Sequence, residues 1–327
     1  DHVKAIADGI HEIDPGKLFT AHSSHLKSSI ESYSEIGLDV NSTYSYCDWA
    51  ASETKSDYER SPTIPFFFVE GRYEGESGWP ECVRSQAYWS VLGGSAGHFF
   101  GNRPIWLFDT GWQSALDSPG SRSMTHFARL FASRPWALLV PDYAETIVSG
   151  NRGSISAKDY TMAARANDGS FVMAYLPTGR TLTVDMSKVA GSAADAWWYD
   201  PENGNSQYLG EFPTSGLQEF TPLDTSDWIL VIDNADKGFP PPGEPGAIAS
   251  VQCNDGVDND ADGLIDFPSD TGCVSATDND ETDPPPAAQC NDGLDNDADG
   301  LTDYPADPGC SNALDNDEFN PPPAQCN

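Results

Sequence analysis

The stretch Pro65-Phe66-Phe67-Phe68-Val69-Glu70 decides the fold of the first part of the chain, because a run of large apolar residues ends at a carboxylate. A continuous apolar run of this length is typical of a strand buried on both faces, as in a parallel sheet. Barrel enzymes present their functional groups where such strands end. We therefore expect Glu70 to stand at the functional edge of a sheet.

Helix-like and strand-like segments alternate on both sides of this stretch. Val3, Ile6, Ala7 and Ile10 repeat with helical spacing, and further helices are expected over residues 84–92 and near residues 124–131. Further strands are expected at residues 18–21, 37–46 and 97–101. Alternating strands and helices predict an α/β fold with a parallel sheet. Because a complete (β/α)8 barrel needs eight strands and about 250 residues, we interpret residues 1–150 as the C-terminal half of a TIM-type barrel.

Residues 151–235 have a different pattern, in which short strand-like segments are separated by turn clusters such as Asn167-Asp168-Gly169. This pattern is typical of an antiparallel β-sandwich. The expected strands are residues 160–166, 170–176, 181–185, 194–199 and 228–232.

The residues after the sandwich form a repeated unit. Residues 236–251 are a Pro- and Gly-rich linker, after which Cys253-Asn254-Asp255-Gly256 returns as Cys290-Asn291-Asp292-Gly293. We assign residues 252–286 and 287–323 to two repeats and residues 324–327 to the start of a truncated third. Both repeats space their two cysteines identically, so the simplest disulfides join Cys253 to Cys273 and Cys290 to Cys310. We therefore expect small, disulfide-stapled units with little regular secondary structure, outside the cell or at its surface.

Alternating aspartates in each repeat match the oxygen ligands of a Ca²⁺ loop. Asp258, Asp260 and Asp262 precede Gly263, as ligands precede the turn glycine of an EF-hand-type loop. The bidentate Glu of that loop is missing, so later carboxylates have to complete the shell. The predicted ligands are Asp258, Asp260, Asp262, Leu264 (through its carbonyl), Asp266, Asp270, Asp278 and Asp280, and in the second repeat Asp295, Asp297, Asp299, Leu301, Asp303, Asp307, Asp315 and Asp317.

Two other interpretations of these acidic repeats fit less well. A solvated acidic linker would not need the same spacing of Asp, Gly and Cys twice. Mg²⁺ is disfavoured because it retains its waters rather than entering an all-protein carboxylate cage. Each repeat also has too few apolar residues for an independent core, so folding should depend on the disulfide and on Ca²⁺.

The charge of the chain excludes two classes of partner. Its formal net charge is -34, and every charged residue after Lys237 is Asp or Glu. Such a chain repels phosphate backbones and anionic lipids, so we expect no nucleic-acid partner. No apolar run is long enough for membrane insertion. Because the first residue is Asp1, we interpret the sequence as a mature or truncated piece of something longer.

Several long motifs occur together in residues 1–233. They include Phe68-Val69-Glu70-Gly71-Arg72-Tyr73-Glu74, Ala96-Gly97-His98-Phe99-Phe100-Gly101-Asn102, Ser133-Arg134-Pro135-Trp136 and Trp197-Trp198-Tyr199-Asp200-Pro201. These motifs resemble the C-terminal half of apiosidase-like glycoside hydrolases (family 140 and relatives) with their appended β-sandwich, once labelled a collagen-binding domain. The Asp-rich repeats resemble thrombospondin type 3-like calcium repeats.

The resemblance implies retaining hydrolysis of a polysaccharide, with Glu70 as the nucleophile on the seventh strand. It implies an acid/base after the fourth strand, upstream of Asp1, so that hydrolysis belongs to a longer parent protein. Val69 replaces the acidic residue common beside the family's nucleophile, which leaves a non-catalytic barrel open. The substrate-binding residues that the resemblance implies are His22, Asn41, Tyr73, Glu74, His98, Asn102 and Trp106.

Three hypotheses follow, in decreasing order of support. The first is a secreted or cell-surface glycoside hydrolase with a calcium-binding repeat stalk. The second is a non-catalytic extracellular structural protein whose calcium-bound repeats self-associate into an extended rod or fibre. The third is a binding module in which Trp197, Trp198 and Tyr199 of the sandwich grip a polysaccharide or a matrix protein.

Overall fold

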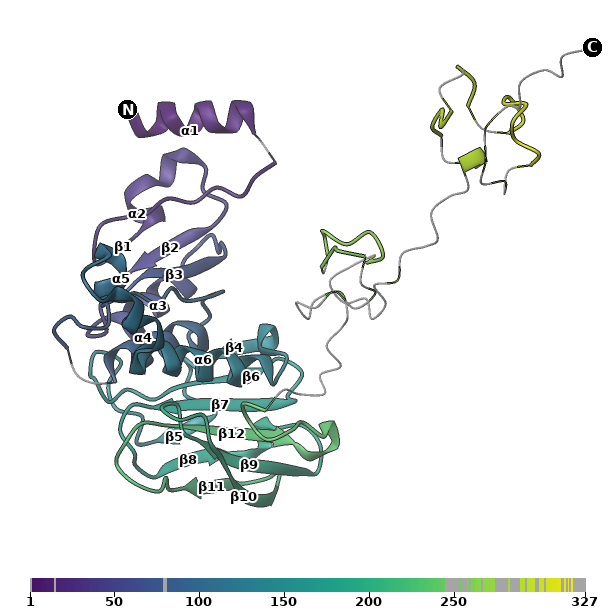
Figure 1. The fold of residues 1–327 in the computed structure, drawn as a ribbon. Helices are drawn as coiled ribbons and strands as arrows, with labels where there is room; N and C mark the ends of the chain where they lie inside the picture. Colours follow the sequence, from purple (N-terminus) through teal and green to yellow (C-terminus); the bar gives the residue numbers. More distant parts are fainter. Residues whose placement is uncertain are drawn as a thin grey trace, which may run out of the picture. The chain divides into compact units, whose positions relative to one another are not determined.

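The computed structural model describes residues 2–14, 16–78 and 81–244 together with part of the tail. The described tail residues are 253, 258, 260, 262–265, 267–273, 282, 289–291, 293–297, 300–302, 304–312, 315, 317 and 319. The chain divides into two compact units, Asp1–Ile248 and Ala249–Asn327, and each is described by itself (Figure 1).

The larger unit begins with an α/β part that contains all the helices predicted there. α1, α4 and α6 confirm the helices expected at the start of the chain, over residues 84–92 and near residues 124–131. The apolar face of α1 is largely exposed, and only Ala7 of that helix is buried. The elements are α1 (His2–Ile13), β1 (Lys27–Ser28), α2 (Ser29–Tyr33), η1 (Ser34–Ile36), β2 (Asn41–Tyr44), α3 (Ala50–Tyr58), β3 (Phe66–Glu70), α4 (Cys82–Leu92), α5 (Arg103–Leu107), η2 (Trp112–Asp117), α6 (Pro119–Ala132) and η3 (Trp136–Leu138).

Four extended segments of this part follow one another side by side. β2 and β3 pair in parallel, which confirms two of the expected strands. The amide of Ala96 donates to the Phe66 carbonyl (2.8 Å) and the amide of Phe99 donates to the Phe68 carbonyl (3.0 Å), so residues 96–99 run along β3. The Phe19 carbonyl accepts from residues 39 and 40, just before β2. Residues 18–21 are therefore extended but form no strand. The order of the four segments is consistent with half of a barrel, and the half-barrel stays a prediction.

Helix α4 is buried along its whole length, because other elements surround it. Every residue from Cys82 to Leu92 is buried. The helix contacts α3 and α6 on one side and strands β6 and β7 of the sandwich on another (Figure 1). A helix that is buried all round lacks a polar face, and α4 accordingly lacks the amphipathic pattern of α6.

The rest of the larger unit is a β-sandwich of two sheets. The sheets have the strand orders β10-β9-β12-β7-β6-β4 and β11-β8-β5, and all their pairs are antiparallel. All five expected strands are present as β6, β7, β8, β9 and β12. The strands are β4 (Leu139–Pro141), β5 (Val148–Gly150), β6 (Met162–Ala166), β7 (Phe171–Leu176), β8 (Leu182–Asp185), β9 (Ala193–Tyr199), β10 (Ser206–Pro213), β11 (Leu217–Phe220) and β12 (Trp228–Asn234).

The sandwich includes residues that we assigned to the α/β part. β4 pairs with β6 and β5 pairs with β8, so residues 139–150 belong to the two sheets. These strands are only three residues long and β4 ends in a proline, which is tolerated at a sheet edge but gives little strand signal. The sandwich therefore begins about a dozen residues before the expected boundary between residues 150 and 151, at residue 139.

Buried polar and aromatic contacts join the α/β part to the sandwich. Arg84 of α4 forms two hydrogen bonds of 2.8 Å with Asp227, just before β12. The rings of Tyr88 and Tyr175 stack at 4.7 Å, and the indole of Trp89 donates to the Tyr160 carbonyl (2.8 Å). One hydrophobic core holds residues of both parts, so the two parts pack as one body.

The described residues of the smaller unit have little regular secondary structure, as the sequence predicts. Its described residues contain the 3-10 turn η7 (Gln289–Asn291) and two disulfides, Cys253–Cys273 and Cys290–Cys310, which confirm the predicted pairing. A third disulfide, Cys47–Cys82, lies in the larger unit. Cys326 lies outside the described residues.

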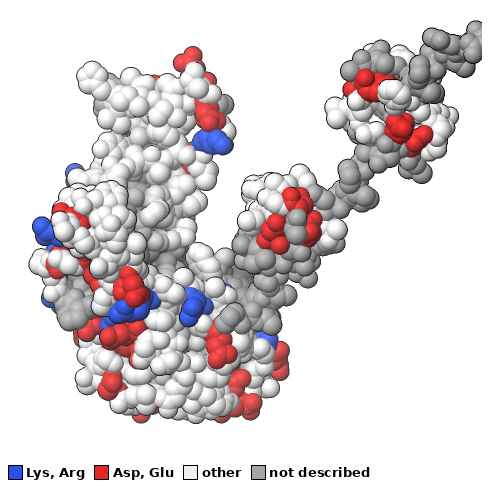
Figure 2. Space-filling model, in the orientation of Figure 1, with Lys and Arg blue, Asp and Glu red and all other residues white. Residues whose placement is uncertain are grey.

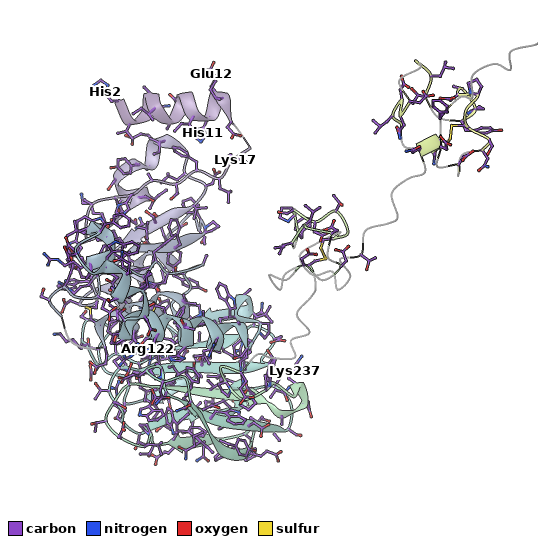
Figure 3. All side chains as sticks on the ribbon, in the orientation of Figure 1. His2, His11, Glu12, Lys17, Arg122 and Lys237 are labelled. Atoms are coloured by element: carbon purple, nitrogen blue, oxygen red, sulfur yellow. A yellow bond between two sulfur atoms is a disulfide. The ribbon has the colours of Figure 1, made fainter. Side chains whose placement is uncertain are left out.

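None of the helices in the described part of the chain has the length and apolar character that a membrane span requires. Lys237, the last basic residue, follows β12 at the end of the sandwich (Figure 3). The acidic side chains drawn in the tail carry no basic neighbours of the same unit (Figure 2).

Replacing Arg84 by Ala would leave the Asp227 carboxylate buried without its cation. We expect the free energy of unfolding to fall by about 3–5 kcal/mol. Urea unfolding followed by tryptophan fluorescence reports this unit alone, because all nine tryptophans lie in it. The control Lys4→Ala removes an exposed ion pair with Asp8 and should cost about 1 kcal/mol or less. Equal losses in the two variants would contradict a structural role for the buried pair.

Candidate functional site

Glu70 ends β3 at a β-bulge that changes the direction of its side chain. Thr43 pairs with Phe68, but the next residue, Tyr44, pairs with Glu70, so Val69 is an extra residue in the ladder. Phe68 is fully buried in the core with residues of α3 and α4. Because side chains alternate along a regular strand, Glu70 would share the face of Phe68 without the bulge. The bulge frees Glu70 from that face, and its carboxylate lies against His22.

The His22–Glu70 contact requires a proton between the two side chains. Nε2 of His22 lies 2.9 Å from Oε2 of Glu70, and Nδ1 lies 2.8 Å from the Ser23 carbonyl oxygen. A carbonyl only accepts, so Nδ1 carries a proton and the contact with Glu70 needs a second one. In the charge-separated form, a protonated His22 donates to the Glu70 carboxylate. The side chains are 47% and 24% exposed, so a ligand can reach both.

Tyr73 and Trp106 form an aromatic side of the same site. Burial raises the pKa of the Tyr73 hydroxyl, and Glu70 raises it further through its charge and a hydrogen bond. Tyr73 therefore remains a protonated donor at neutral pH. Its ring meets the Trp106 ring edge-on at 5.8 Å, and Trp106 is 63% exposed. An exposed indole beside a carboxylate offers a stacking surface to a ring-shaped ligand.

Four further residues, which are not among the residues predicted from the sequence, complete the site. His25 stacks on Tyr46 at 3.9 Å, and the guanidinium of Arg72 lies 4.3 Å from the centre of the same ring. The Tyr44 hydroxyl lies 3.4 Å from that of Tyr46, and burial, followed by that hydrogen bond, raises the pKa of Tyr44. Burial lowers the pKa of His25, and the charge of Arg72 lowers it further. The feature of the sequence that could have identified them is their position, because each lies at or just beyond the end of an extended segment.

Asn41 does not reach Glu70, although we expected both in one site. Asn41 starts β2 and pairs with Phe66, at the other end of the strand that Glu70 ends. Four residues of strand separate those positions by about 13 Å. The Asn41 side chain is buried and accepts hydrogen bonds from Ser29 and Ile30, which is a structural arrangement.

Glu74 and Asn102 form hydrogen bonds at the start of helix α6. The Gly120 amide donates to Oε1 of Glu74 (2.8 Å), and Ser118 and Asn102 both donate to Oε2. A carboxylate at a helix N-terminus satisfies free amides and complements the helix dipole. Both carboxylate oxygens of Glu74 accept hydrogen bonds from within the chain, so Glu74 and Asn102 help to position the start of α6 beside the site.

His98 lies on the helix-facing side of the sheet. It pairs with the buried Phe68 and lines a cavity of about 400 Å³ together with Met124, Phe127 and Trp136. Its two ring nitrogens are buried without a hydrogen-bond partner, and burial lowers its pKa to about 3. His98 is therefore neutral and lies in an apolar setting, and its role in substrate binding stays a prediction.

The loop after Glu70 is held to α4. The Arg72 amide donates to the Gln86 side chain (3.0 Å), which in turn donates to the Arg72 carbonyl (2.8 Å). A Cβ on Gly71 would lie 2.5 Å from the Gln86 side-chain oxygen, so a larger residue here would displace the Gln86 amide from Arg72. The disulfide Cys47–Cys82 ties the segment after Tyr46 to the first residue of α4. The site is thus fixed from the buried helix.

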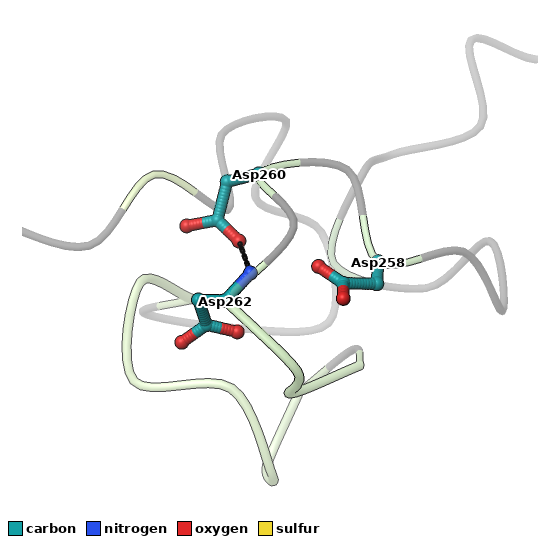
Figure 4. Close-up of side chains that lie close together, drawn as sticks. All are labelled: Asp258, Asp260 and Asp262. Carbon is teal, nitrogen blue, oxygen red and sulfur yellow. Dashed lines mark hydrogen bonds between the residues drawn. The ribbon is translucent and has the colours of Figure 1, made fainter.

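The first tail repeat brings three of its predicted ligands together. One oxygen from each of Asp258, Asp260 and Asp262 lies within 4.8 Å of the others (Figure 4). Gly263 has a φ of +96°, and its amide donates to Asp258 (3.1 Å), so this glycine makes the expected sharp turn. Asp270 is 2% exposed, and its Oδ2 is buried without a hydrogen-bond partner. A buried carboxylate oxygen of this kind fits an oxygen-binding cation.

The second repeat uses the same local contacts. The Gly300 amide donates to Asp295 (3.0 Å), as Gly263 donates to Asp258, and Asp307 is 1% exposed like Asp270. Asp315 accepts from the Ser311 amide, and Asp317 accepts from the Phe319 amide. The assignments of Asp297, Leu264 and Leu301 as ligands stay predictions. The other predicted ligands, Asp266, Asp278, Asp280, Asp299 and Asp303, lie outside the described residues.

Two family models match the larger unit. Residues 1–138 match the model described as "Apiosidase-like, catalytic domain". Residues 140–233 match the model described as "Putative collagen-binding domain of a collagenase". The change from one model to the other falls where the sandwich begins, at β4. No curated protein is similar enough to count as a match.

Solved structures of glycoside hydrolases share the fold of this unit. One titled "Glycoside hydrolase" is 27% identical with a TM-score of 0.64, over 71% of this chain and 61% of that one. A glycoside hydrolase family 5 protein from Bacteroides vulgatus is 24% identical with a TM-score of 0.65, over 73% of this chain and 62% of that one. This chain thus spans 61% and 62% of the length of these two structures. It contains a glycoside hydrolase-like domain followed by a β-sandwich.

Proposed function

We propose that this chain carries the nucleophile of a retaining, apiosidase-like glycoside hydrolase that acts on polysaccharide. The observation that carries the proposal is the Glu70 carboxylate, which ends a buried strand against His22 and Tyr73 within a region similar to a catalytic domain. A retaining glycosidase needs such a carboxylate to attack the anomeric carbon and form a glycosyl ester, which water then hydrolyses.

The neighbours of Glu70 suit this role. Nε2 of His22 lies 2.9 Å from Oε2 of Glu70, so the imidazole orients the carboxylate for attack. Burial and then the nearby Glu70 charge raise the pKa of the Tyr73 hydroxyl, so Tyr73 stays protonated and available as a hydrogen-bond donor beside the carboxylate. The exposed ring of Trp106 beside Tyr73 supplies a stacking surface for a sugar.

A retaining mechanism also needs an acid/base carboxyl about 5–5.5 Å from the nucleophile. That group is not among the predicted site residues of this chain. Tests of hydrolysis therefore use the full-length protein, and binding tests can use the chain itself.

We propose that the tail repeats bind Ca²⁺ and stiffen the chain outside the cell. The clustered oxygens of Asp258, Asp260 and Asp262, the turn at Gly263 and the buried Asp270 support this assignment in the first repeat. Three disulfides support an oxidising compartment. Bound Ca²⁺ would neutralise carboxylates that otherwise repel one another.

A structural protein is the second candidate. The observation that favours it is the likeness of the two repeats, which have matching Asp–Gly hydrogen bonds and disulfides. Such repeats suit an extended, calcium-bound rod that self-associates. Loss of hydrolysis on changing Glu70 separates the enzyme from this alternative, because a rod does not need that carboxylate.

In the full-length protein, Glu70→Gln should lower kcat for polysaccharide hydrolysis by about 10³-fold or more, because the amide is not a nucleophile. Its thermal stability should remain close to that of the parent. The matched control, Glu74→Gln, keeps one oxygen to accept from the Gly120 amide but loses the charge and the second acceptor oxygen, and should lower the free energy of unfolding by about 1–3 kcal/mol. Hydrolysis that survives Glu70→Gln at the parental rate would rule out the nucleophile assignment.

For Ca²⁺, the double variant Asp258→Asn, Asp262→Asn should bind at least about tenfold more weakly than the parent in calorimetric titration, because two charged ligands are lost. The control Glu219→Gln removes a charge from exposed β11 and should leave binding unchanged. Chelation should expose residues 252–323 to protease while the larger unit stays intact. Identical digestion with and without chelator would count against calcium-dependent folding.

A further inference from the structure

A polar groove lies at the junction of α6 and the sandwich, apart from the Glu70 site. Its volume is about 740 Å³, within the ~300–1,000 Å³ range of ligand sites. Arg129 lines it from α6, Asn205 from the turn before β10, Ser206 from the first position of β10, and Glu244 from the segment after β12. Glu74 accepts a hydrogen bond at the N-terminus of α6. Arg129 lies ten residues further along this helix, about 15 Å from that end.

Contacts between the walls give the groove a defined shape. The Tyr199 hydroxyl donates to the His126 carbonyl of α6 (2.8 Å), and the Gly243 amide donates to the Ser133 hydroxyl (3.3 Å). A Cβ on Gly204 would lie 2.4 Å from the His126 ring, and one on Gly243 would lie 2.6 Å from the Tyr199 ring. Glycine is needed at both positions, so the backbone of these two residues forms part of the groove wall. The polar side chains that line the groove surround this stretch of backbone.

An aromatic pair adjoins the groove on the same face of the sheet. Ser206 and Tyr208 are alternate residues of β10, so their side chains project from one face. Tyr208 pairs with Trp197 on β9, and the two rings lie 4.7 Å apart. Tyr208 is 49% exposed, and its hydroxyl donates to Asp195 (2.7 Å), which holds the ring in place.

Trp198 and Tyr199, the other two residues of the predicted binding motif, are buried in the core. They cannot grip a ligand at the surface. The aromatic surface that a ligand can reach on this side of the sandwich is therefore supplied by Tyr208 with the partly buried Trp197.

We propose that this groove is a non-catalytic carbohydrate-binding site of the larger unit. Sugar hydroxyls both donate and accept, and the guanidinium, amide, hydroxyl and carboxylate of the four lining residues provide both functions. The apolar face of a sugar ring stacks on the exposed Tyr208 ring beside these polar groups. A polysaccharide held in the groove remains tethered to the rigid body that carries Glu70, which raises its effective concentration at that residue.

The test compares three variants of the full-length protein on a Glu70→Gln background, which prevents cleavage of the probe. Arg129→Ala and Tyr208→Ala remove groove residues. Arg122→Ala removes a charge from the same helix one and a half to two turns earlier and serves as the matched control (Figure 3). Binding is measured by affinity electrophoresis in soluble xylan, a neutral polysaccharide, and in polygalacturonate, an acidic one.

Both groove variants should weaken binding to at least one polysaccharide by about fivefold or more, and Arg122→Ala should bind like the parent. Both altered side chains are exposed, so unchanged thermal unfolding should confirm that the variants fold. With Glu70 intact, cleavage of a small aryl glycoside should proceed at the parental rate in both groove variants, which separates this site from the catalytic one. Parental binding in both groove variants, or no binding of the parent to either polysaccharide, would overturn the proposal.

Discussion

The complete burial of α4 is the constraint on which the rest of the larger unit depends. This helix separates the α/β part from the six-stranded sheet and has no side that faces solvent. Its arginine, Arg84, is tolerated there because Asp227 forms two hydrogen bonds with it. Because Asp227 belongs to the sandwich, the buried Arg84 of α4 has its partner only when the two parts are packed together. The sandwich is therefore part of the body that forms the site and is not a separately moving attachment.

The same helix determines the geometry around Glu70. Gln86 holds the backbone of Arg72, and Cys82 ties the segment after Tyr46 through a disulfide. Arg72 in turn stacks on Tyr46, whose ring lies against His25. Rotamers locked in this way give a site that needs little reordering when a ligand binds. Catalysis on such a site draws on positioning as much as on the chemical groups themselves.

The sequence predicts the elements of this fold better than the directions of its side chains. The apolar run ending at Glu70, the helical spacing in α6 and the spacing of the tail cysteines each depend on local pattern, and each prediction is confirmed. Pairing register is not local, so no motif reveals that Asn41 pairs with Phe66 at the far end of β3 from Glu70. The bulge at Val69 and the role of Glu74 at the start of α6 depend on contacts between segments far apart in the chain, which no single motif encodes. In the tail, spacing predicts the Gly263 turn and the grouping of Asp258, Asp260 and Asp262, and both are observed.

The most direct measurement of the central assignment is the identification of the residue that becomes covalently attached to sugar. The full-length protein would be incubated with an activated glycoside whose 2-hydroxyl is replaced by fluorine, which slows hydrolysis of the ester intermediate. Peptide mass spectrometry would then locate the label. The assignment of Glu70 as nucleophile predicts a sugar ester on the peptide that contains Phe68-Val69-Glu70-Gly71. A label on a different carboxylate, in a protein that hydrolyses its substrate with retention, would contradict it.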